Sequence, residues 1–250
     1  MRMEDGCLPA RASGRGFYRG CDLFIHYIWD EEVGRMKGKI EHYWNEAYGN
    51  PNYHPDHDGW LVPYLPLLRP DGGRIVDLGC GLGHNARMLN AAGFTVSACD
   101  LSVQAIERLR SEEPGIDVFP LDMTQGLPWE DGAVQAVVAD LSLHYFPENI
   151  TLAVLSDIRR VLQADGLLLC RLNATGELAD KPDAIPVEGD AHLYEDEGIL
   201  RRFFDEGEIA RFFPVQNWEI LTCREAQSGR YGKVKYLWEL AIKTNVSTKD

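Results

Sequence analysis

The sequence predicts an α/β fold in which a seven-stranded, mostly parallel sheet carries helices on both faces and ends in an antiparallel strand. From about residue 72 onward, short apolar runs alternate with segments of helical periodicity, the pattern of parallel strands joined by helical crossovers. The apolar runs are nearly continuous, as expected for strands covered on both faces. A chain of 250 residues is long enough for one such domain with a buried core.

Five apolar runs predict the parallel strands, and three segments of helical period fit between them. Ser102 and Pro147 stand where two of the helices are expected to start. The predicted strands cover residues 74–78, 95–99, 116–120, 133–139 and 167–172, and the predicted helices cover residues 84–92, 102–113 and 148–162.

The pattern changes after the fifth strand. Residues 173–200 are acidic and are expected to form a loop, and residues 204–213 favour a short helix. Two further strands, 218–223 and 235–243, flank the turn-rich segment AQSGRYG and are predicted to form an antiparallel hairpin at the sheet edge.

The N-terminal part of the chain differs from the rest. Residues 1–37 are mostly polar and weakly periodic, so we interpret them as an extension or flap before a domain of residues 38–250. Within residues 38–48, Ile40, Tyr43, Trp44 and Ala47 follow the spacing i, i+3, i+4, i+7, which predicts a helix with one apolar, aromatic face. That face is suited to covering a pocket.

The composition indicates a cytoplasmic protein with no nucleic-acid or membrane partner. The formal net charge is −14, and the only dense basic cluster is Arg11, Arg15 and Arg19, whereas binding to a phosphate backbone needs clustered cations. No stretch approaches 18 apolar residues, and the N-terminus lacks the apolar segment of a signal peptide. The six cysteines form no C-x-x-C pair, so we expect reduced thiols.

The strongest chemical signal is the segment RIVDLGCGLGHNA, an apolar strand that leads into a glycine-rich turn before a helix. Glycines such as Gly79 and Gly81 permit a tight turn and let the backbone approach a ligand closely. Asp100 ends the second strand, 23 residues after Asp77, near the spacing at which an acid meets ribose hydroxyls in dinucleotide folds. Asp122 follows the third strand, which places all three carboxylates along one edge of the sheet.

Two nucleoside cofactors compete for this turn. The NAD fingerprint is G-x-G-x-x-G, but His84 takes the place of its third glycine here, and the motif is G-x-G-x-G. A carboxylate beside the turn, Asp77, disfavours a pyrophosphate and favours a cationic ligand. The residues therefore favour S-adenosylmethionine, which carries an ammonium and a sulfonium and no phosphate.

These motifs resemble the class I S-adenosylmethionine-dependent methyltransferases across about residues 40–243, which implies a Rossmann-like fold. The segment from Asp77 to Gly83 resembles the first motif of that family, and Asp140-Leu141 resembles the fourth. The resemblance implies that the methyl donor is bound and released as S-adenosylhomocysteine. The cofactor-binding residues that it implies are Asp77, Gly79, Cys80, Gly81, Asn85, Asp100, Leu101, Asp122, Met123, Asp140 and Leu141.

The ends of the chain are similar to small-molecule methyltransferases of the tellurite-resistance and thiopurine types, through the WNEAY and LHYF segments and the late RRFFDEGEIARFF run. The acceptor is accordingly expected to be a small molecule that is methylated on O, N or S, or is a metalloid oxyanion. Tyr43, Trp44, His144 and Tyr145 are the candidate acceptor-binding residues. His144 is also the candidate general base, because an imidazole titrates near neutral pH.

Each candidate has a structural alternative. His144 is equally interpreted as a pocket-wall histidine, since methyl transfer can run on alignment alone, and aromatics at helical spacing are often ordinary packing. The HPDHD run around His57 is expected to be a solvated loop, so no metal site is predicted. Arg201 and Arg202 are expected to form surface ion pairs.

At the level of the whole protein, two alternatives to methyl transfer stay open. One is a regulatory protein that binds S-adenosylmethionine without turnover, and the other is an NAD-dependent oxidoreductase. Neither the acceptor nor the choice between monomer and homodimer follows from the sequence.

Overall fold

The structure is a computed structural model that describes residues 22–230 and 232–245. The chain divides into two compact units, Met1–Lys37 and Gly38–Asp250, and the account below concerns the second. The basic cluster Arg11, Arg15 and Arg19, together with Cys7 and Cys21, lies outside the described residues.

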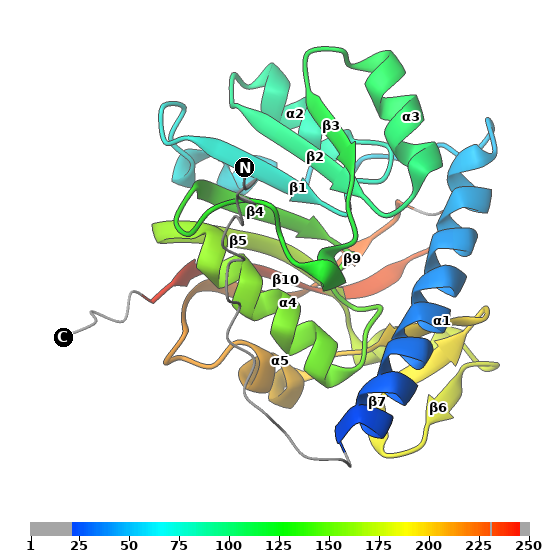
Figure 1. Ribbon diagram of the computed structural model, residues 1–250. Coiled ribbons are helices and arrows are strands. Elements are labelled where there is room, and N and C mark those ends of the chain that lie inside the picture. Colours follow the sequence, from blue (N-terminus) through cyan, green and yellow to red (C-terminus); the bar gives the residue numbers. More distant parts are fainter. Residues whose placement is uncertain (1–21, 231, 246–250) are drawn as a thin grey trace, which may run out of the picture. The chain divides into compact units, whose positions relative to one another are not determined.

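Seven strands form one sheet in the order β3-β2-β1-β4-β5-β10-β9 (Figure 1). The first five run parallel to one another, and β10 pairs antiparallel with both β5 and β9. The predicted α/β class and the antiparallel hairpin are confirmed. The strands are β1 (Arg74–Leu78), β2 (Val96–Asp100), β3 (Asp117–Pro120), β4 (Val134–Asp140), β5 (Leu162–Asn173), β9 (Trp218–Ser228) and β10 (Lys235–Thr244).

Helices cover both faces of this sheet (Figure 1). One core cluster joins the sheet to α2 (His84–Ala91), α3 (Val103–Glu112) and the 3-10 helix η1 (Val62–Leu67). The other joins it to α4 (Glu148–Val161) and α5 (Glu206–Phe212). All seven residues of β4 are buried because that strand lies at the centre between the two cores.

The helix starts follow from local capping. The Ser102 hydroxyl accepts a hydrogen bond from Ala105 N at 3.3 Å at the start of α3, and Asp205 accepts one from Glu208 N at 2.8 Å at the start of α5. Such side-chain oxygens satisfy backbone N–H groups that have no partner within the helix. The predicted start of α3 at Ser102 is therefore confirmed.

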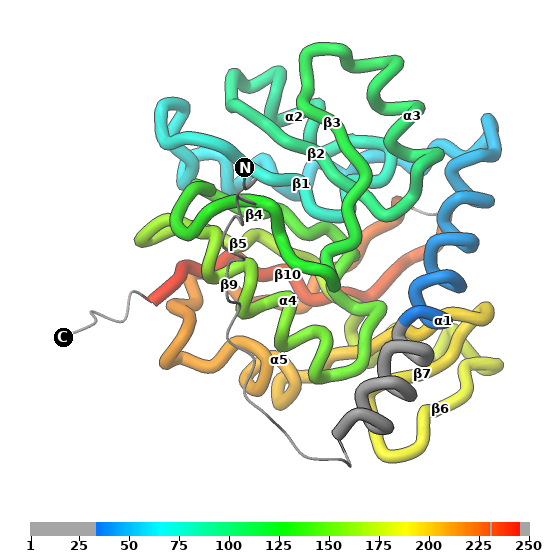
Figure 2. The backbone as a smooth tube through the Cα atoms, in the orientation of Figure 1, coloured from blue at the N-terminus to red at the C-terminus, as the bar shows by residue number. Residues whose placement is uncertain are grey.

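The prediction of a loop over residues 173–200 is wrong. This segment forms the 3-10 helix η3 (Thr175–Asp180) and a second sheet of β6 (Ile185–Val187), β7 (Asp190–Asp196) and β8 (Ile199–Arg202), drawn in yellow in Figure 2. Apolar periodicity missed these strands because much of what they bury is charged. Arg202 is 0% exposed and pairs with Asp190 and Glu208, so this segment buries charged side chains as ion pairs.

The helix predicted over residues 38–48 is the second part of α1 (Asp22–Gly49). Its Ile40 side chain is buried, and Lys39 pairs with Glu195 of β7 at 3.0 Å. The aromatic residues of this part therefore lie between the second sheet and the domain core.

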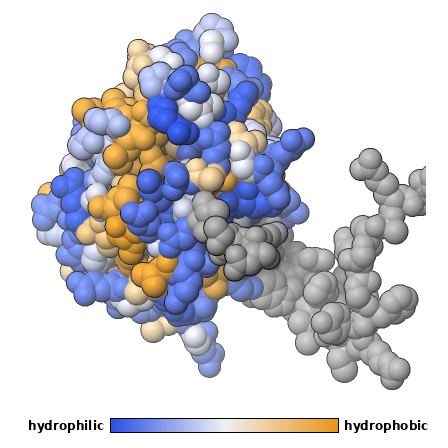
Figure 3. All heavy atoms as spheres, turned by 90° about the vertical axis from the view of Figure 1, so that its left-hand side faces the viewer, coloured by the Kyte–Doolittle hydropathy of each residue, from blue (hydrophilic) through white to orange (hydrophobic). Residues whose placement is uncertain are grey.

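Some hydrophobic surface is left exposed. Strand β9 forms one edge of the large sheet and exposes Ile220 and Leu221, and Figure 3 shows a face on which hydrophobic atoms gather in a band among hydrophilic ones. Exposed apolar surface of this kind is where proteins associate. No helix in the described part of the chain is long and apolar enough to cross a membrane.

Candidate functional site

The glycine-rich turn lies at the carboxyl end of β1, where Gly79, Gly81 and Gly83 all have a φ between +51° and +76°. Side chains are strained in this left-handed region, so glycine is required. A Cβ on Gly79 would also overlap the side chain of Ser142. The N–H groups of Gly79 and Cys80 donate to the Cys99 carbonyl at 2.8 and 3.0 Å, which anchors the turn to the end of β2.

Asp100 stabilises the next part of the turn through hydrogen bonds. Its Oδ2 accepts a hydrogen bond from Gly81 N and its Oδ1 one from Ser102 N, both at 2.8 Å. The carboxylate is 8% exposed, and burial raises its pKa against the effect of these N–H donors. One carboxylate therefore links the glycine turn to the start of α3.

Asp77 is fully buried beneath the turn. Its Oδ2 accepts from Ala86 N at 3.0 Å, and its Oδ1 has no hydrogen-bond partner among the described residues. Burial, and then the nearby charge of Asp140, raise its pKa to about 8. A cation placed beside this carboxyl would lower that pKa and stabilise the ionised form.

The third acid, Asp122, lies beside the second. Leu121 N donates to the Asp100 carbonyl at 2.9 Å, so the ends of β2 and β3 are adjacent, in keeping with the pairing of Asp100 with Pro120. The Asp122 Oδ1 accepts from the N–H and hydroxyl of Thr124 and caps the 3-10 helix η2 (Met123–Gln125). Leu101 and Met123 are partly buried here, and the predicted edge of carboxylates is thus assembled.

Asp140 at the end of β4 is occupied by protein groups. Its carboxylate accepts from Arg171 at 2.7 and 3.0 Å, from Arg230 at 2.6 Å and from Asn85 at 3.1 Å. Burial opposes ionisation, but Arg171 and Arg230 outweigh it and lower the pKa of Asp140. The carboxylate thus positions Asn85 and two arginines, and its predicted contact with the cofactor stays a prediction.

The chain makes a strained turn directly after Asp140. Leu141 has a φ of 60°, which is unusual for a residue with a branched side chain. The next hydroxyl, Ser142 Oγ, donates to the Leu78 carbonyl at 2.6 Å. This turn locks the segment after β4 against the glycine turn, and such strain is common where a backbone must be held in one position.

The prediction that HPDHD is a solvated loop is only half right. His54 and Asp56 are exposed, but His57 Nε2 lies 3.3 Å from Asn85 Oδ1, and Asp58 Oδ2 accepts from Arg171 at 2.5 Å. The neighbouring Trp60 stacks under the Arg171 guanidinium, 4.8 Å from the ring centroid. Within residues 22–230 and 232–245, no group of three His, Cys, Asp or Glu side chains is arranged to hold a metal ion.

Aromatic residues from α1 cover the turn. Trp44 stacks on Tyr48 with ring centroids 5.1 Å apart and meets Tyr145 edge-on at 6.1 Å. The Tyr48 hydroxyl would lie 2.5 Å from a Cβ on Gly81. Tyr43 instead donates to Glu197 at 2.9 Å and accepts from Arg201, so it ties α1 to the second sheet.

His144 is 1% exposed, and its Nδ1 has no hydrogen-bond partner in the described chain. Burial, and then the charge of Lys235, hold its pKa well below the usual range. Burial therefore argues against an imidazole that titrates near neutral pH, and the role of His144 as a base stays a prediction. Its neighbour Tyr145 lies 4.4 Å away between ring centroids, which places both residues at the carboxyl end of β4.

Arg201 and Arg202 form the predicted ion pairs, but in the interior. Arg201 is 8% exposed and pairs with Asp196 and with Glu197, the latter at 2.8 Å. These pairs hold the second sheet in shape.

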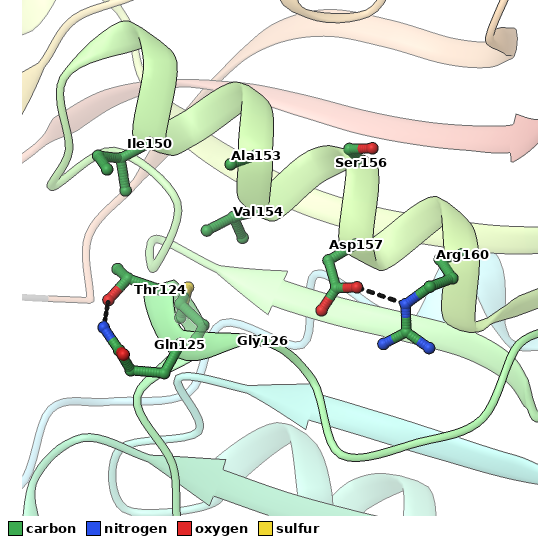
Figure 4. A pocket seen from close by; sticks show the side chains of 10 residues that line it. Thr124, Gln125, Gly126, Ile150, Ala153, Val154, Ser156, Asp157 and Arg160 are labelled. Carbon is green, nitrogen blue, oxygen red and sulfur yellow. Dashed lines mark hydrogen bonds and ion pairs between the residues drawn. The ribbon is translucent and has the colours of Figure 1, made fainter. Parts of the chain in front are cut away.

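A surface groove of about 520 Å³ lies next to this region, between η2 and α4 (Figure 4). Thr124 and Gln125 face Ile150 and Val154 across it. Of the predicted site residues only Met123 lines the groove, and none of the glycine turn does. The groove is therefore separate from the carboxylate edge.

Four residues of this region were not predicted: Arg171, Asn173, Arg230 and Lys235. Asn173 could have been recognised from the sequence, because it is a polar residue that directly follows the apolar run 167–172 at a predicted strand end. The other three are recognised only through partners distant in the chain. Arg171, for example, pairs with Asp58 across 113 positions.

The parallel sheet, the glycine turn anchored by a strand-end acid, and the antiparallel hairpin define a Rossmann-like domain. Residues 75–166 match the protein family described as a methyltransferase domain. The chain is therefore similar to methyltransferases, and these findings support the resemblance to the class I S-adenosylmethionine-dependent enzymes.

The chain is 27% identical over 194 residues to "Putative methyltransferase YqeM" of Bacillus subtilis, which covers 66% of this chain and 77% of that protein. It spans only 47% of the length of two other curated methyltransferases that it matches. The similarity to the subgroup of tellurite-resistance and thiopurine enzymes stays a prediction.

Solved structures share the fold. An S-adenosylmethionine-dependent methyltransferase from Methanosarcina mazei superposes with a TM-score of 0.63 at 16% identity, over 74% of this chain and 97% of that one. The 1,6-didemethyltoxoflavin-N1-methyltransferase of Burkholderia thailandensis superposes with a TM-score of 0.56 at 17% identity, over 94% and 95%. The latter structure contains its substrate and S-adenosylhomocysteine.

Proposed function

We propose that residues 38–250 form a domain that binds S-adenosylmethionine across the carboxyl ends of β1 to β4 and methylates a small molecule. The observation that carries this proposal is the buried Asp77, whose Oδ1 has no partner beneath a turn of left-handed glycines. A buried polar atom without a partner is costly unless a ligand or water satisfies it. An ammonium or sulfonium near this carboxyl would favour its ionised form, whereas a pyrophosphate would disfavour that form.

The remaining residues fit the parts of such a ligand. Asp100 would hold the ribose hydroxyls with the carboxylate face not used by Gly81, and Leu101, Asp122 and Met123 would border the adenine. The turn Gly79-Cys80-Gly81, whose N–H groups bond Cys99 and Asp100, would let the methionyl part approach its backbone closely, with Asn85 and Leu141 beside it. In the proposal, Asp140 acts by orienting Asn85 and the arginines and does not itself touch the ligand.

When bound, S-adenosylmethionine would supply an electrophilic methyl group on its sulfonium; the acceptor would gain the methyl group and lose its proton to solvent, and S-adenosylhomocysteine would be the product. The protein's part is then mainly positioning and exclusion of water. Tyr48 and Trp44 cover the turn, and Tyr145 would align the acceptor. His144, which stays neutral, would accept a hydrogen bond from the acceptor rather than act as a base that titrates near pH 7.

The acceptor is proposed to be a small organic molecule. A neighbour of the same fold, a 1,6-didemethyltoxoflavin-N1-methyltransferase, has 1,6-didemethyltoxoflavin bound, which supports a small organic acceptor. We propose a cytoplasmic enzyme, monomeric or homodimeric, without a nucleic-acid or membrane partner, in keeping with its net charge of −14.

Calorimetric titration with S-adenosylmethionine, S-adenosylhomocysteine and NAD tests the proposal. The wild type is expected to bind both adenosyl ligands and not NAD. Asp100→Asn is expected to weaken that binding about ten- to hundredfold, because it removes a charge-assisted hydrogen bond. Asp71→Asn is the matched control, since Asp71 is exposed and lies just before β1, at the opposite end of the strands.

Binding of NAD alone, or of none of the three ligands, would contradict the proposal. Tight binding of S-adenosylmethionine without release of S-adenosylhomocysteine across a broad acceptor panel would favour a regulatory protein that binds the cofactor without turnover.

A further inference from the structure

Three buried polar atoms near the carboxyl ends of β4 and β5 have no hydrogen-bond partner in the described chain. They are the two amide atoms of Asn173, Oδ1 and Nδ2, and the Nδ1 of His144. Asn173 is 0% exposed and His144 is 1% exposed. Nearly all buried polar atoms in proteins are hydrogen-bonded, so two such side chains need an explanation.

One short segment holds both residues in place. Arg202 N donates to the His144 carbonyl at 2.7 Å, and Phe204 N donates to the Asn173 carbonyl at 2.8 Å. The segment 202–204 therefore bridges the two strand ends. The carbonyls of His144 and Asn173 are thus bonded, whereas His144 Nδ1 and both amide atoms of Asn173 lack partners.

The charges around these side chains are already compensated. Four cationic residues, which lie in the second sheet, at the C-cap of η3 and in β10, each have carboxylate partners. The pairs are Lys181 with Asp196, Arg201 with Asp196 and Glu197, Arg202 with Asp190 and Glu208, and Lys235 with Glu177. At the strand ends beside them, Arg171 pairs with Asp140 and Asp58. An anionic acceptor would have to compete with these carboxylates, whereas a neutral one would not.

We infer that Asn173 and His144 select a neutral acceptor that presents a hydrogen-bonding edge, with an N–H or O–H beside a carbonyl oxygen or ring nitrogen. The inference rests on the proposed function and names its class of substrate. An amide side chain offers one acceptor and two donors, which complement an edge of that kind. The ring of Tyr145 beside His144, and Trp44 beside Tyr145, provide aromatic surfaces for a planar molecule.

Substitution of Asn173 by leucine separates a binding role from a structural one. Leucine has a similar size and removes both unpaired amide atoms, so the variant is expected to fold with an equal or higher melting temperature. Gln135 provides the matched control, because it is a buried amide at the start of β4 whose side chain bonds the Arg69 N–H and carbonyl at 2.6 and 3.0 Å. Gln135→Leu is expected to lower the melting temperature and to leave acceptor binding unchanged.

The acceptor is unidentified, so the probes are matched pairs of small ring compounds, studied by saturation-transfer NMR with S-adenosylhomocysteine present. Lactams such as 2-pyridone carry the edge, their N-methylated counterparts lack the donor, and benzoate tests for an anion site. We expect lactams to bind in preference to both counterparts, and Asn173→Leu to weaken that binding at least about tenfold.

Four results would each overturn the inference. They are a preference for benzoate, equal binding of the N-methylated probes, no lactam binding at all, and lactam binding that is unchanged in Asn173→Leu. These results leave the proposed function intact as long as S-adenosylhomocysteine binds. Failure of S-adenosylhomocysteine to bind would instead count against the proposed function itself.

Discussion

Arg171 binds Asp140 through two hydrogen bonds, from Nε to Oδ1 at 2.7 Å and from Nη2 to Oδ2 at 3.0 Å. The two side chains are 2% and 3% exposed, and they join the ends of two neighbouring parallel strands. Asp58, from the loop before η1, shares the same guanidinium at 2.5 Å. A buried charge cluster therefore lies directly behind the proposed cofactor site.

Removing the cation from this cluster is expected to be costly. Arg171→Met leaves two carboxylates without their main partner, and breaking a buried pair in this way destabilises a protein by about 3–5 kcal/mol. Urea unfolding measures the free energy. Lys243→Met is the control, because Lys243 lies 4.0 Å from an exposed Asp165, and it is expected to change stability by less than about 1 kcal/mol. Equal losses in both variants would contradict this reading of the cluster.

Gly79 is expected to tolerate no side chain. Gly79→Ala places a Cβ at a φ of +75° and into the side chain of Ser142, so it combines backbone strain with a clash. Gly93 has a φ of +89° with open space around its Cβ position, so Gly93→Ala isolates the strain, about 1–2 kcal/mol. Thermal unfolding should show a larger loss for Gly79→Ala, by about 1–3 kcal/mol. A similar loss in both would exclude the clash.

Cofactor binding is expected to release a proton from Asp77. Because the pKa of Asp77 is raised to about 8, the folded protein holds a proton there at pH 7. A cationic ligand lowers that pKa and displaces the proton, so affinity for S-adenosylmethionine should rise with pH from 6 to 8 and level off above. Calorimetry in two buffers of different ionisation enthalpy counts the protons released, and Asp77→Asn should release fewer. A wild-type proton count of zero would contradict the assignment.

His144 is expected to stay neutral throughout the range from pH 5.5 to 8. Its pKa lies well below the ordinary value because the ring is buried and Lys235 is close, so protonation would require a buried imidazolium next to a cation. Nitrogen-15 NMR of the histidine rings measures this directly. The ring signals of the exposed His42 serve as an internal reference in the same spectra. Titration of His144 between pH 6 and 7 would restore it as a candidate general base.

The strands and the glycine turn were predictable because their signals are local. β1 coincides with the predicted run 74–78, and the left-handed φ angles of Gly79 and Gly81 are a property that glycine alone adopts without strain. The ends of β2 and β3, which carry Asp100 and Asp122, were also predicted to lie at one edge, and Leu121 N bonds the Asp100 carbonyl there, since parallel strands end at the same edge of a sheet.

The second sheet was not predictable in the same way. Its burial depends on ion pairs such as Arg202 with Glu208, and charged residues in a sequence indicate solvent unless their partners are known. The role expected of Asp140 shows the same limit, because Arg230, which binds it, lies 90 positions further along the chain.

The sequence by itself determined the α/β class, the place of the glycine turn and the kind of cofactor it suits, because apolar periodicity, glycine and strand-end acids act over a few residues. Only the tertiary structure decided which buried polar groups have partners. Asp140 is fully satisfied while Asn173 is not, and that difference arises from contacts between segments far apart in the chain, which alone determine burial and charge balance.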